Sequence, residues 1–203
     1  METLVLGGAV ALWAAVHSWL ASTNMKELAR KRLGVGAVRA YRLAYNAFSV
    51  LTLAPIGLLM RAVPDRLLYR VEAPWSLLLL GGQAISVFLL MLALLQTDTL
   101  HFAGISQLLG RRTSSLLVTT GFYRVVRHPL YLFGLLILWL TPFMTMGQLT
   151  VYAVLTIYLY VGAIFEERRL LQEFGAAYDE YRSRTPMIIP GPRRGGGTRK
   201  TRA

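Results

Sequence analysis

Residues 129–165 read PLYLFGLLILWLTPFMTMGQLTVYAVLTIYLYVGAIF, a run of 37 residues without an Asp, Glu, Lys or Arg. One helix needs only about 20 residues to cross a hydrocarbon core of about 30 Å, so the run is nearly long enough for two crossings. Residues 141–147, in its middle, contain a Pro and a Gly, which interrupt helices. The sequence therefore predicts a transmembrane helical hairpin that turns at residues 141–147.

A hairpin returns the chain to the membrane face from which it started. Arg127 and His128 precede the first helix of this hairpin, and Glu166 and Glu167 end the second. Ionisable side chains at membrane depth are candidates for function. We therefore expect these basic and acidic side chains to surround one pocket, which is the first candidate for an active site.

The composition indicates a membrane protein with further spans. Hydrophobic residues make up 55% of the 203 residues and charged residues only 16%, whereas soluble proteins carry about 25% charged residues. Three more uncharged stretches of roughly spanning length are residues 4–21, 44–60 and 75–97. The first has no basic segment before it and no convincing cleavage context, so we expect a retained helix rather than a signal peptide.

The predicted fold class is all-α, a polytopic membrane protein with five transmembrane helices, the last two a hairpin, followed by a cytoplasmic C-terminal helical segment. We expect residues 1–189 to form a single domain. Residues 190–203 combine Pro, Gly and basic residues and are predicted to be a disordered basic tail.

The basic residues predict the orientation in the membrane. Of the 22 Lys and Arg residues, all but Arg61, Arg66 and Arg70 fall in the first and third loops or after the hairpin. Because cytoplasmic loops carry the basic excess, the N-terminus should lie outside, and the active site and C-terminus should be cytoplasmic. The net charge of +12 then faces anionic lipid head groups, and no nucleic acid partner is expected.

The sequence contains no cysteine, which excludes disulfides, thiolate metal sites and a cysteine nucleophile. The three histidines lie in separate segments without the spacing of metal ligands, so no metal is expected. Residues 114–123, SSLLVTTGFY, suit either close approach of a ligand or an ordinary surface turn.

The residues at the hairpin ends allow two interpretations, an anchor in the lipid interface or a ligand site. Pro129 is well placed in the first turn of a helix, and Arg127 and Tyr131 could simply anchor that helix in the lipid interface. Glu166 and Glu167 oppose the helix dipole at a C-terminal end, so a cationic ligand or a basic side chain would supply the missing partner.

The ordered combination of TGFYRVVRHPLY at residues 120–131, EERRL at 166–170 and FGAAYDEY at 174–181 resembles the integral-membrane methyltransferases of the isoprenylcysteine carboxyl methyltransferase-like superfamily. The resemblance covers roughly residues 107–190. It implies a membrane fold of five to eight helices that binds S-adenosylmethionine in a cytoplasmic pocket closed by the C-terminal segment. It also implies a small or lipophilic methyl acceptor and the bilayer as partners.

Matching positions carry the site residues that the resemblance implies. Catalytic roles fall on Arg127, His128 and Glu167. Cofactor contacts fall on Gln107, Ser115, Leu116, Leu117, Val118, Gly121, Tyr123, His128, Pro129, Tyr131 and Glu166. In the prenylcysteine enzymes an arginine one turn before the glutamates reaches the substrate carboxylate, and Gly162 stands at that position here. This departure argues against formation of a prenylcysteine ester.

Motifs in the N-terminal half of the sequence point to narrower groups within this superfamily. HSWLAS at residues 17–22, YRLAYNAFSV at 41–50 and TPFMT at 141–145 look like the bacterial methanethiol S-methyltransferase group and the NnrU proteins associated with denitrification. The predicted function is therefore a bacterial inner-membrane methyltransferase that uses S-adenosylmethionine and acts on a thiol resembling methanethiol. The alternatives are an NnrU-like accessory protein without enzymatic activity and a prenylcysteine or lipid methyltransferase. The oligomeric state is left open.

Overall fold

The computed structural model describes residues 2–62, 64–109 and 116–191 and is mostly helical. Its helices are α1 (Glu2–Ala21), α2 (Thr23–Ala62), α3 (Trp75–Leu95), α4 (Thr99–Ala103), α5 (Ile105–Leu108), the 3-10 helix η1 (Gly121–Arg124), α6 (Pro129–Trp139), α7 (Met146–Phe174) and α8 (Ala176–Arg184). Two short strands, β1 (Leu67–Arg70) and β2 (Phe143–Thr145), complete the described elements. The predicted tail falls largely on residues 192–203, which lie outside the described residues.

Four helices are long and apolar enough to cross a membrane. They contain the segments Thr3–Ala21, Val38–Ala62, Trp75–Leu95 and Met146–Phe174, in agreement with three predicted stretches and the second half of the hairpin. The first half of the hairpin holds α6, an apolar helix of 11 residues that extends for only about 16 Å. The five-helix count therefore stays a prediction, because this segment is not helical over a full span.

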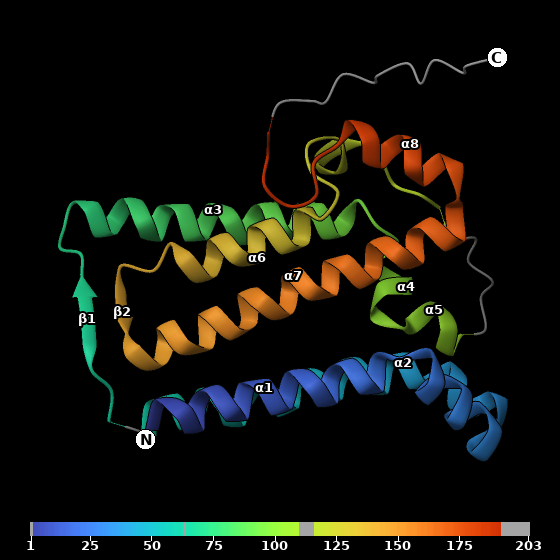
Figure 1. Cartoon of the computed structure of the whole chain (residues 1–203), viewed down its shortest axis with the longest axis horizontal. Coiled ribbons are helices and arrows are strands. Elements are labelled where there is room, and N and C mark those ends of the chain that lie inside the picture. The colour runs from blue at the N-terminus through green and yellow to red at the C-terminus, as the bar shows by residue number, and fades with distance from the viewer. Residues whose placement is uncertain (1, 63, 110–115, 192–203) are drawn as a thin grey trace, which may run out of the picture.

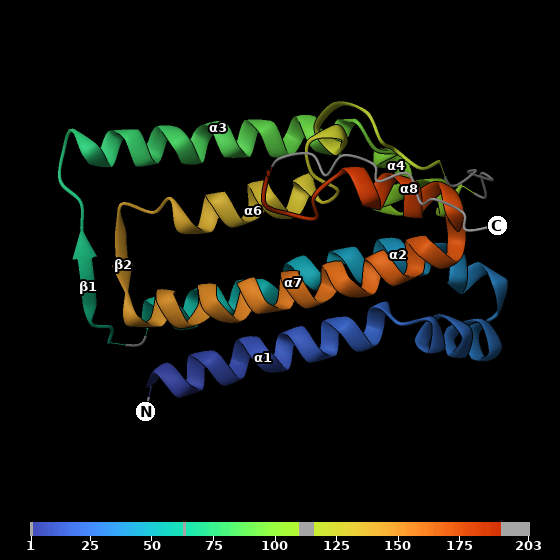
Figure 2. The same cartoon turned by 45° about the horizontal axis from the view of Figure 1, so that its top comes forward.

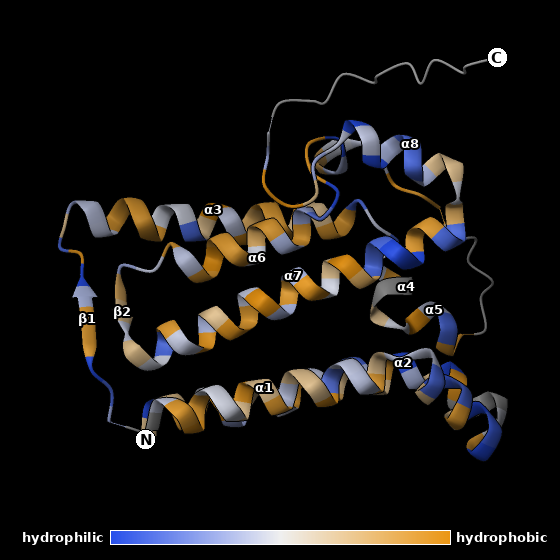
Figure 3. Cartoon of the chain, in the orientation of Figure 1, coloured by the Kyte–Doolittle hydropathy of each residue, from blue (hydrophilic) through white to orange (hydrophobic). Residues whose placement is uncertain are grey.

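The helices expose apolar side chains to their surroundings. Only 6–17% of the residues in the spanning segments are buried inside the protein. Leu12, Phe88 and Ile157 are each more than 60% exposed. Figure 3 shows apolar residues along α1, α3, α6 and α7, with hydrophilic residues gathered where α7 meets α8. Such a surface suits the hydrocarbon of a bilayer.

The spanning helices lie side by side in two groups (Figures 1 and 2). α3 packs mainly against α6, and α1 packs against both α2 and α7. The predicted hairpin turn is confirmed, since the chain leaves α6 at Leu140 and begins α7 at Met146. Thr145 caps α7 by accepting from the Gln148 amide, while the Gln148 side chain accepts from the Thr145 amide.

A small antiparallel sheet lies beside this turn and was not part of the all-α prediction. β1 pairs with β2, with Leu67 opposite Thr145 and Arg70 opposite Phe143. The Asp65 carboxylate accepts from the Gly147 amide at 2.9 and 3.1 Å, which ties the start of α7 to the segment before β1. Strands of three and four residues are too short to show an alternating pattern, so the sequence does not reveal them.

One polar cluster lies among the apolar side chains of α1, α2 and α7. The His17 ring hydrogen-bonds to the Tyr45 hydroxyl through Nε2 and to the Ser49 hydroxyl through Nδ1, the latter at 2.9 Å. Trp13 stacks on His17 with ring centroids 4.9 Å apart, and Tyr158 of α7 meets it edge-on at 5.9 Å. These contacts fasten α1 to both of its neighbours.

Candidate functional site

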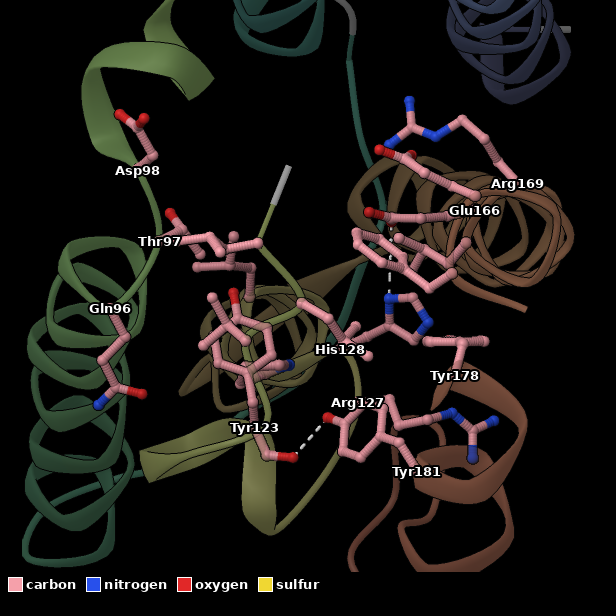
Figure 4. Close-up of a pocket in the computed structure, with 18 of the residues that line it drawn as sticks. Gln96, Thr97, Asp98, Tyr123, Arg127, His128, Glu166, Arg169, Tyr178 and Tyr181 are labelled. Carbon is pink, nitrogen blue, oxygen red and sulfur yellow. Dashed lines mark hydrogen bonds and ion pairs between the residues drawn. The ribbon is translucent and has the colours of Figure 1, made fainter. Parts of the chain in front are cut away.

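A cavity of about 630 Å³ opens where the ends of α3, α6 and α7 meet α8 (Figure 4). Its size falls within the range of about 300–1,000 Å³ typical of small-molecule sites. The cavity brings together segments that lie far apart in the sequence. Nine of the predicted site residues line it: Leu116, Leu117, Val118, Tyr123, Arg127, His128, Pro129, Tyr131 and Glu166.

The start of α6 is held by the segment that follows α8. His128 precedes the helix and Pro129 opens it, where a missing N–H costs no helical hydrogen bond. The Arg127 amide donates to the Pro186 carbonyl at 2.9 Å, and the His128 amide donates to the Met187 carbonyl at 3.0 Å. The C-terminal segment thus packs against one side of the cavity and contributes Tyr178 and Tyr181 to its lining.

Glu167 lies behind the cavity at the centre of a hydrogen-bond network. Its two carboxylate oxygens accept from Nε and Nη2 of Arg127, both at 2.8 Å. The Tyr178 hydroxyl donates to Glu167 Oε1 at 2.6 Å, and His128 Nε2 lies 2.8 Å from the same oxygen. The side chains of Arg127 and Glu167 are 9% and 10% exposed, so this is a buried ion pair and not a lipid-facing anchor.

Arg127 also fastens α8 through its remaining nitrogen. Nη1 donates to the Arg182 carbonyl at 3.0 Å and to the Thr185 carbonyl. Together with the two bonds to Glu167, each of the three guanidinium nitrogens has a partner. Arg127 therefore connects α7, the start of α6 and the end of α8.

His128 lies between the two glutamates. Its Nε2 faces Glu167, and its Nδ1 is 3.6 Å from Glu166 Oε2. The Tyr131 ring stacks on the imidazole, with centroids 5.2 Å apart and planes 5° from parallel. Burial alone would lower the pKa of His128, but hydrogen bonds with Glu166 and Glu167 outweigh it and raise the pKa above its usual value. The arrangement favours a protonated imidazole.

Glu166 differs from Glu167 in facing the cavity. The Tyr131 hydroxyl donates to Glu166 Oε2 at 2.9 Å, and the Glu166 side chain is 37% exposed. Consecutive residues of a helix point about 100° apart, so Glu167 is buried while Glu166 lies at the cavity surface. Glu166 therefore keeps acceptor capacity for a ligand, whereas Glu167 is surrounded by protein donors.

The opposite wall is formed by η1 and the end of α3. The Tyr181 hydroxyl donates to the Tyr123 carbonyl at 2.5 Å, which joins α8 to η1. Burial and then the nearby Glu166 charge raise the pKa of Tyr123 to about 12, so its hydroxyl is neutral. The Phe122 amide donates to Gln96 Oε1 at 3.0 Å. Gly121 has φ of 60°, and a side chain there would collide with Gln96, so this wall depends on a glycine.

The structure separates the predicted residues into four groups. Nine line the cavity, and Glu167 supports them from behind. Gln107 on α5 and Gly121 on η1 are not among the lining residues, and Ser115 lies outside the described residues.

Sequence reasoning missed the other lining residues: Arg42, Gln96, Thr97, Asp98, Leu130, Arg169, Leu170, Glu173, Phe174, Tyr178 and Tyr181. Helical spacing from Glu166 could have found Arg169, Leu170 and Glu173, because positions three, four and seven residues apart share a helix face. Nothing in the sequence pattern points to Arg42, which comes from a different helix.

Comparison with known proteins gives one family match. The phospholipid methyltransferase family profile matches residues 73–177, which include the α6–α7 hairpin and most of the cavity. No solved structure matches the chain.

Named relatives agree with this match. The chain is 30% identical to a methanethiol S-methyltransferase of a Pseudomonas species over 191 residues, which is 89% of this chain and 70% of that protein. It is 31% identical to the methanethiol S-methyltransferase of Pseudomonas deceptionensis over 93% of this chain and 73% of that one. A 68-residue segment is 52% identical to methanethiol S-methyltransferase 2 of Bradyrhizobium diazoefficiens, where it spans 34% of this chain and 26% of the relative.

Proposed function

This chain belongs to the phospholipid methyltransferase family, and on that premise we propose that it is a membrane enzyme that transfers a methyl group from S-adenosylmethionine to a small lipophilic thiol. The observation that carries the proposal is the different surroundings of two adjacent glutamates. Glu167 is enclosed by Arg127, His128 and Tyr178. Glu166 presents a partly exposed carboxylate to a cavity of about 630 Å³.

The residues of the cavity fit the cofactor. S-adenosylmethionine carries an ammonium and a sulfonium group, and a carboxylate such as Glu166 is a suitable partner for positive charge. The neutral Tyr123 ring offers an aromatic surface for a base or a cation. When bound, the cofactor supplies an electrophilic methyl group, which a nucleophile takes by in-line displacement.

The residues of the protein position the methyl donor and the acceptor and exclude water from them. Both ring nitrogens of His128 face carboxylates, Nδ1 toward Glu166 and Nε2 toward Glu167, and its raised pKa favours the protonated ring, which has no lone pair to take a proton from the acceptor. It therefore acts as a positioning group and not as a general base. The α8 segment covers the site through the bonds of Tyr178 and Tyr181, which keeps bulk water from the reacting groups.

A thiol acceptor is supported by the names of relatives that align over most of this chain. The thiolate is the reactive form of a thiol and attacks without a covalent enzyme intermediate, in keeping with a chain that has no cysteine. Gly162 lies one turn before Glu166, and a side chain added there would meet nothing within 4 Å. Glycine supplies no cation at this position, which argues against a prenylcysteine carboxylate as the acceptor.

We place this enzyme in a bacterial inner membrane with the N-terminus outside and the cavity at the cytoplasmic face. The cavity lies at the end of the bundle that carries α8 and the hydrophilic end of α7 (Figure 3). The basic residues of the sequence are concentrated in the segments at that end.

The experiment is binding of S-adenosylhomocysteine, the demethylated product, to the detergent-purified protein by titration calorimetry. We expect saturable binding by the wild type and at least about tenfold weaker binding by Glu166→Gln, because a charge-assisted hydrogen bond is lost. Glu180→Gln is the matched control, since Glu180 is 62% exposed and lies on the α8 surface.

Equal affinities of Glu166→Gln and wild type would overturn the assigned role of Glu166. A folded wild type that binds no nucleoside would overturn the proposed methyltransferase function and favour the alternative of an NnrU-like accessory protein. Product analysis with a small alkyl thiol, a phospholipid and a prenylcysteine then tests the acceptor. Methylation of the thiol alone is expected. Methylation of the phospholipid instead would agree with the family match and would overturn the proposal that a thiol is the acceptor.

A further inference from the structure

Two arginine side chains from different helices meet at one wall of the cavity. Arg42 of α2 and Arg169 of α7 both line it. Lys26 does not line the cavity, but desolvation and then the positive charges of Arg169 and Arg42 lower its pKa. Figure 4 shows Arg169 beside Glu166, with Asp98 across the cavity.

The course of α2 brings the part that holds Lys26 back toward the part that holds Arg42. Lys26 and Arg42 are 16 residues apart, so a straight helix would separate them by about 24 Å. Gly34, with φ of 79° and ψ of −179°, interrupts the helix between them. The chain turns back at this point (Figure 2), which returns the first part of α2 toward the second. Glycine adopts this left-handed conformation without steric cost.

Arg42 is held in position from behind by the corner between α4 and α5. A Cβ at Gly104, whose φ is 93°, would lie 2.6 Å from the Leu43 amide nitrogen and 3.1 Å from Arg42 Cβ. The Asn46 side chain donates to the Ala103 carbonyl at 3.0 Å and fixes the same corner. The backbone at Arg42 is therefore packed, while its side chain reaches the cavity.

The ion pairs formed within the described parts of the chain do not include Lys26, Arg42 or Arg169. Each nitrogen of the Arg127 guanidinium, by contrast, has a partner in Glu167 or a backbone carbonyl. Like charges that meet at one wall repel one another. Carboxylates also line the cavity, but none of them forms an ion pair with Arg42 or Arg169 among the described residues, so both guanidinium groups keep donors for an anionic ligand group.

We infer that Arg42 and Arg169 form an anion subsite that takes the α-carboxylate of the methionine group of S-adenosylmethionine. The inference rests on the proposed function. The cavity then recognises both signs of charge on one ligand, with Glu166 for the cationic groups and the basic wall for the carboxylate. Arg42 is suited to this role because a guanidinium binds a carboxylate through two parallel hydrogen bonds.

The basic wall comes partly from outside the family match. Arg42 precedes residue 73, where the match begins, whereas Arg169 lies inside it. The front half of the chain thus contributes to the ligand site and is not only a membrane anchor.

The test compares S-adenosylhomocysteine with its decarboxylated analogue, the same nucleoside ending in a 3-aminopropyl group, by calorimetry. Arg42→Gln should weaken binding of S-adenosylhomocysteine about tenfold and that of the analogue less than about twofold, because only the first ligand carries the charge that Arg42 pairs with. Arg39→Gln is the matched control, since Arg39 is exposed on the same helix and does not line the cavity.

The outcomes separate the subsite from the proposed function. A wild type that binds both ligands equally, or an Arg42→Gln variant that weakens both equally, would overturn the subsite and leave the function standing. A wild type that binds neither ligand would overturn the function itself. Should Arg42→Gln unfold, Arg169→Gln must show the same selective loss.

A phospholipid phosphate is the other source of an anion at this wall. Native mass spectrometry of the purified protein counts the phospholipids that remain bound. If Arg42→Gln loses a bound phospholipid but still prefers the carboxylated nucleoside, the anion bound at this wall is a lipid phosphate. That result would overturn the proposal that the wall binds the carboxylate of the cofactor.

Discussion

Arg127 and Glu167 form a two-bond ion pair across 40 residues of sequence, with both nitrogen–oxygen distances at 2.8 Å. The pair joins the start of α6 to α7, and the Arg127 bonds to Arg182 and Thr185 carry the connection to α8. Because Glu166 precedes Glu167 on the same helix, the pair also fixes the direction in which Glu166 points. Adjacent carboxylates thereby divide into one that holds the site together and one that faces the ligand.

Glu167→Gln should lower the free energy of unfolding by about 3 kcal/mol, because it leaves the buried Arg127 charge without its partner. The measurement is thermal unfolding of the detergent-purified protein. Glu180→Gln breaks an ion pair with Arg184 in which both side chains are more than 60% exposed, and should change stability by less than about 1 kcal/mol. Equal shifts for the two variants would contradict a structural role for the buried pair.

Stability should fall as the pH rises above about 6.5, the ordinary pKa of histidine. The pKa of His128 is raised in the folded protein, so its contribution is fully present below the unfolded value and is lost as pH rises through the folded value. Unfolding midpoints measured from pH 6 to about pH 9 test this. His128→Gln should flatten the profile in that window, and an unchanged slope would show that another group is responsible.

Gly147→Ala should destabilise the protein by about 1–3 kcal/mol through overpacking. A Cβ at this position would lie 2.6 Å from Asp65 Oδ2 and 2.9 Å from Leu6 Cδ1. Gly8→Ala in α1 is the control, because a Cβ there meets nothing within 4 Å. The measurement is thermal unfolding of both variants. Equal stability of Gly147→Ala and Gly8→Ala would contradict close packing of Asp65 and Leu6 against Gly147.

The orientation is testable because the chain has no cysteine to mask a new one. Arg66→Cys places a thiol at the end of the molecule that holds β1, and Ser183→Cys places one on exposed α8. A membrane-impermeant maleimide applied to intact cells should label only Arg66→Cys. Labelling of Ser183→Cys alone would reverse the predicted orientation.

Tyr181→Phe tests whether α8 covers the cavity through its bond to η1. The Tyr181 hydroxyl donates to the Tyr123 carbonyl at 2.5 Å, and its loss should weaken binding of S-adenosylhomocysteine several-fold while costing about 1 kcal/mol of stability. Ser183→Ala, on the exposed side of α8, serves as the control in the same calorimetric titration. Undiminished nucleoside binding by Tyr181→Phe would show that this bond does not hold the site closed.

The spans were predictable because a bilayer imposes a length and an absence of charge that are visible in any sequence. Residues 4–21 and 75–97 coincide with α1 and α3 within about two residues at each end. α6 was predicted as a crossing from the same rule, but its helix ends at Trp139, and the chain continues through the turn and β2 to α7. Hydropathy reports which residues avoid water and does not report where a helix stops.

Nine of the 20 lining residues were predicted, from the resemblance of the sequence motifs, and the other eleven were not. The sequence by itself determined the apolar stretches of spanning length and the prediction that Arg127 and His128 meet Glu166 and Glu167, because an uncharged run with a Pro and a Gly in its middle indicates a hairpin. Only the tertiary structure decided that Glu167 is enclosed, that Glu166 faces the cavity, and that Arg42 reaches it from α2. The rotation of a helix about its axis, and the distance between helices far apart in sequence, are set by packing, which no local pattern encodes.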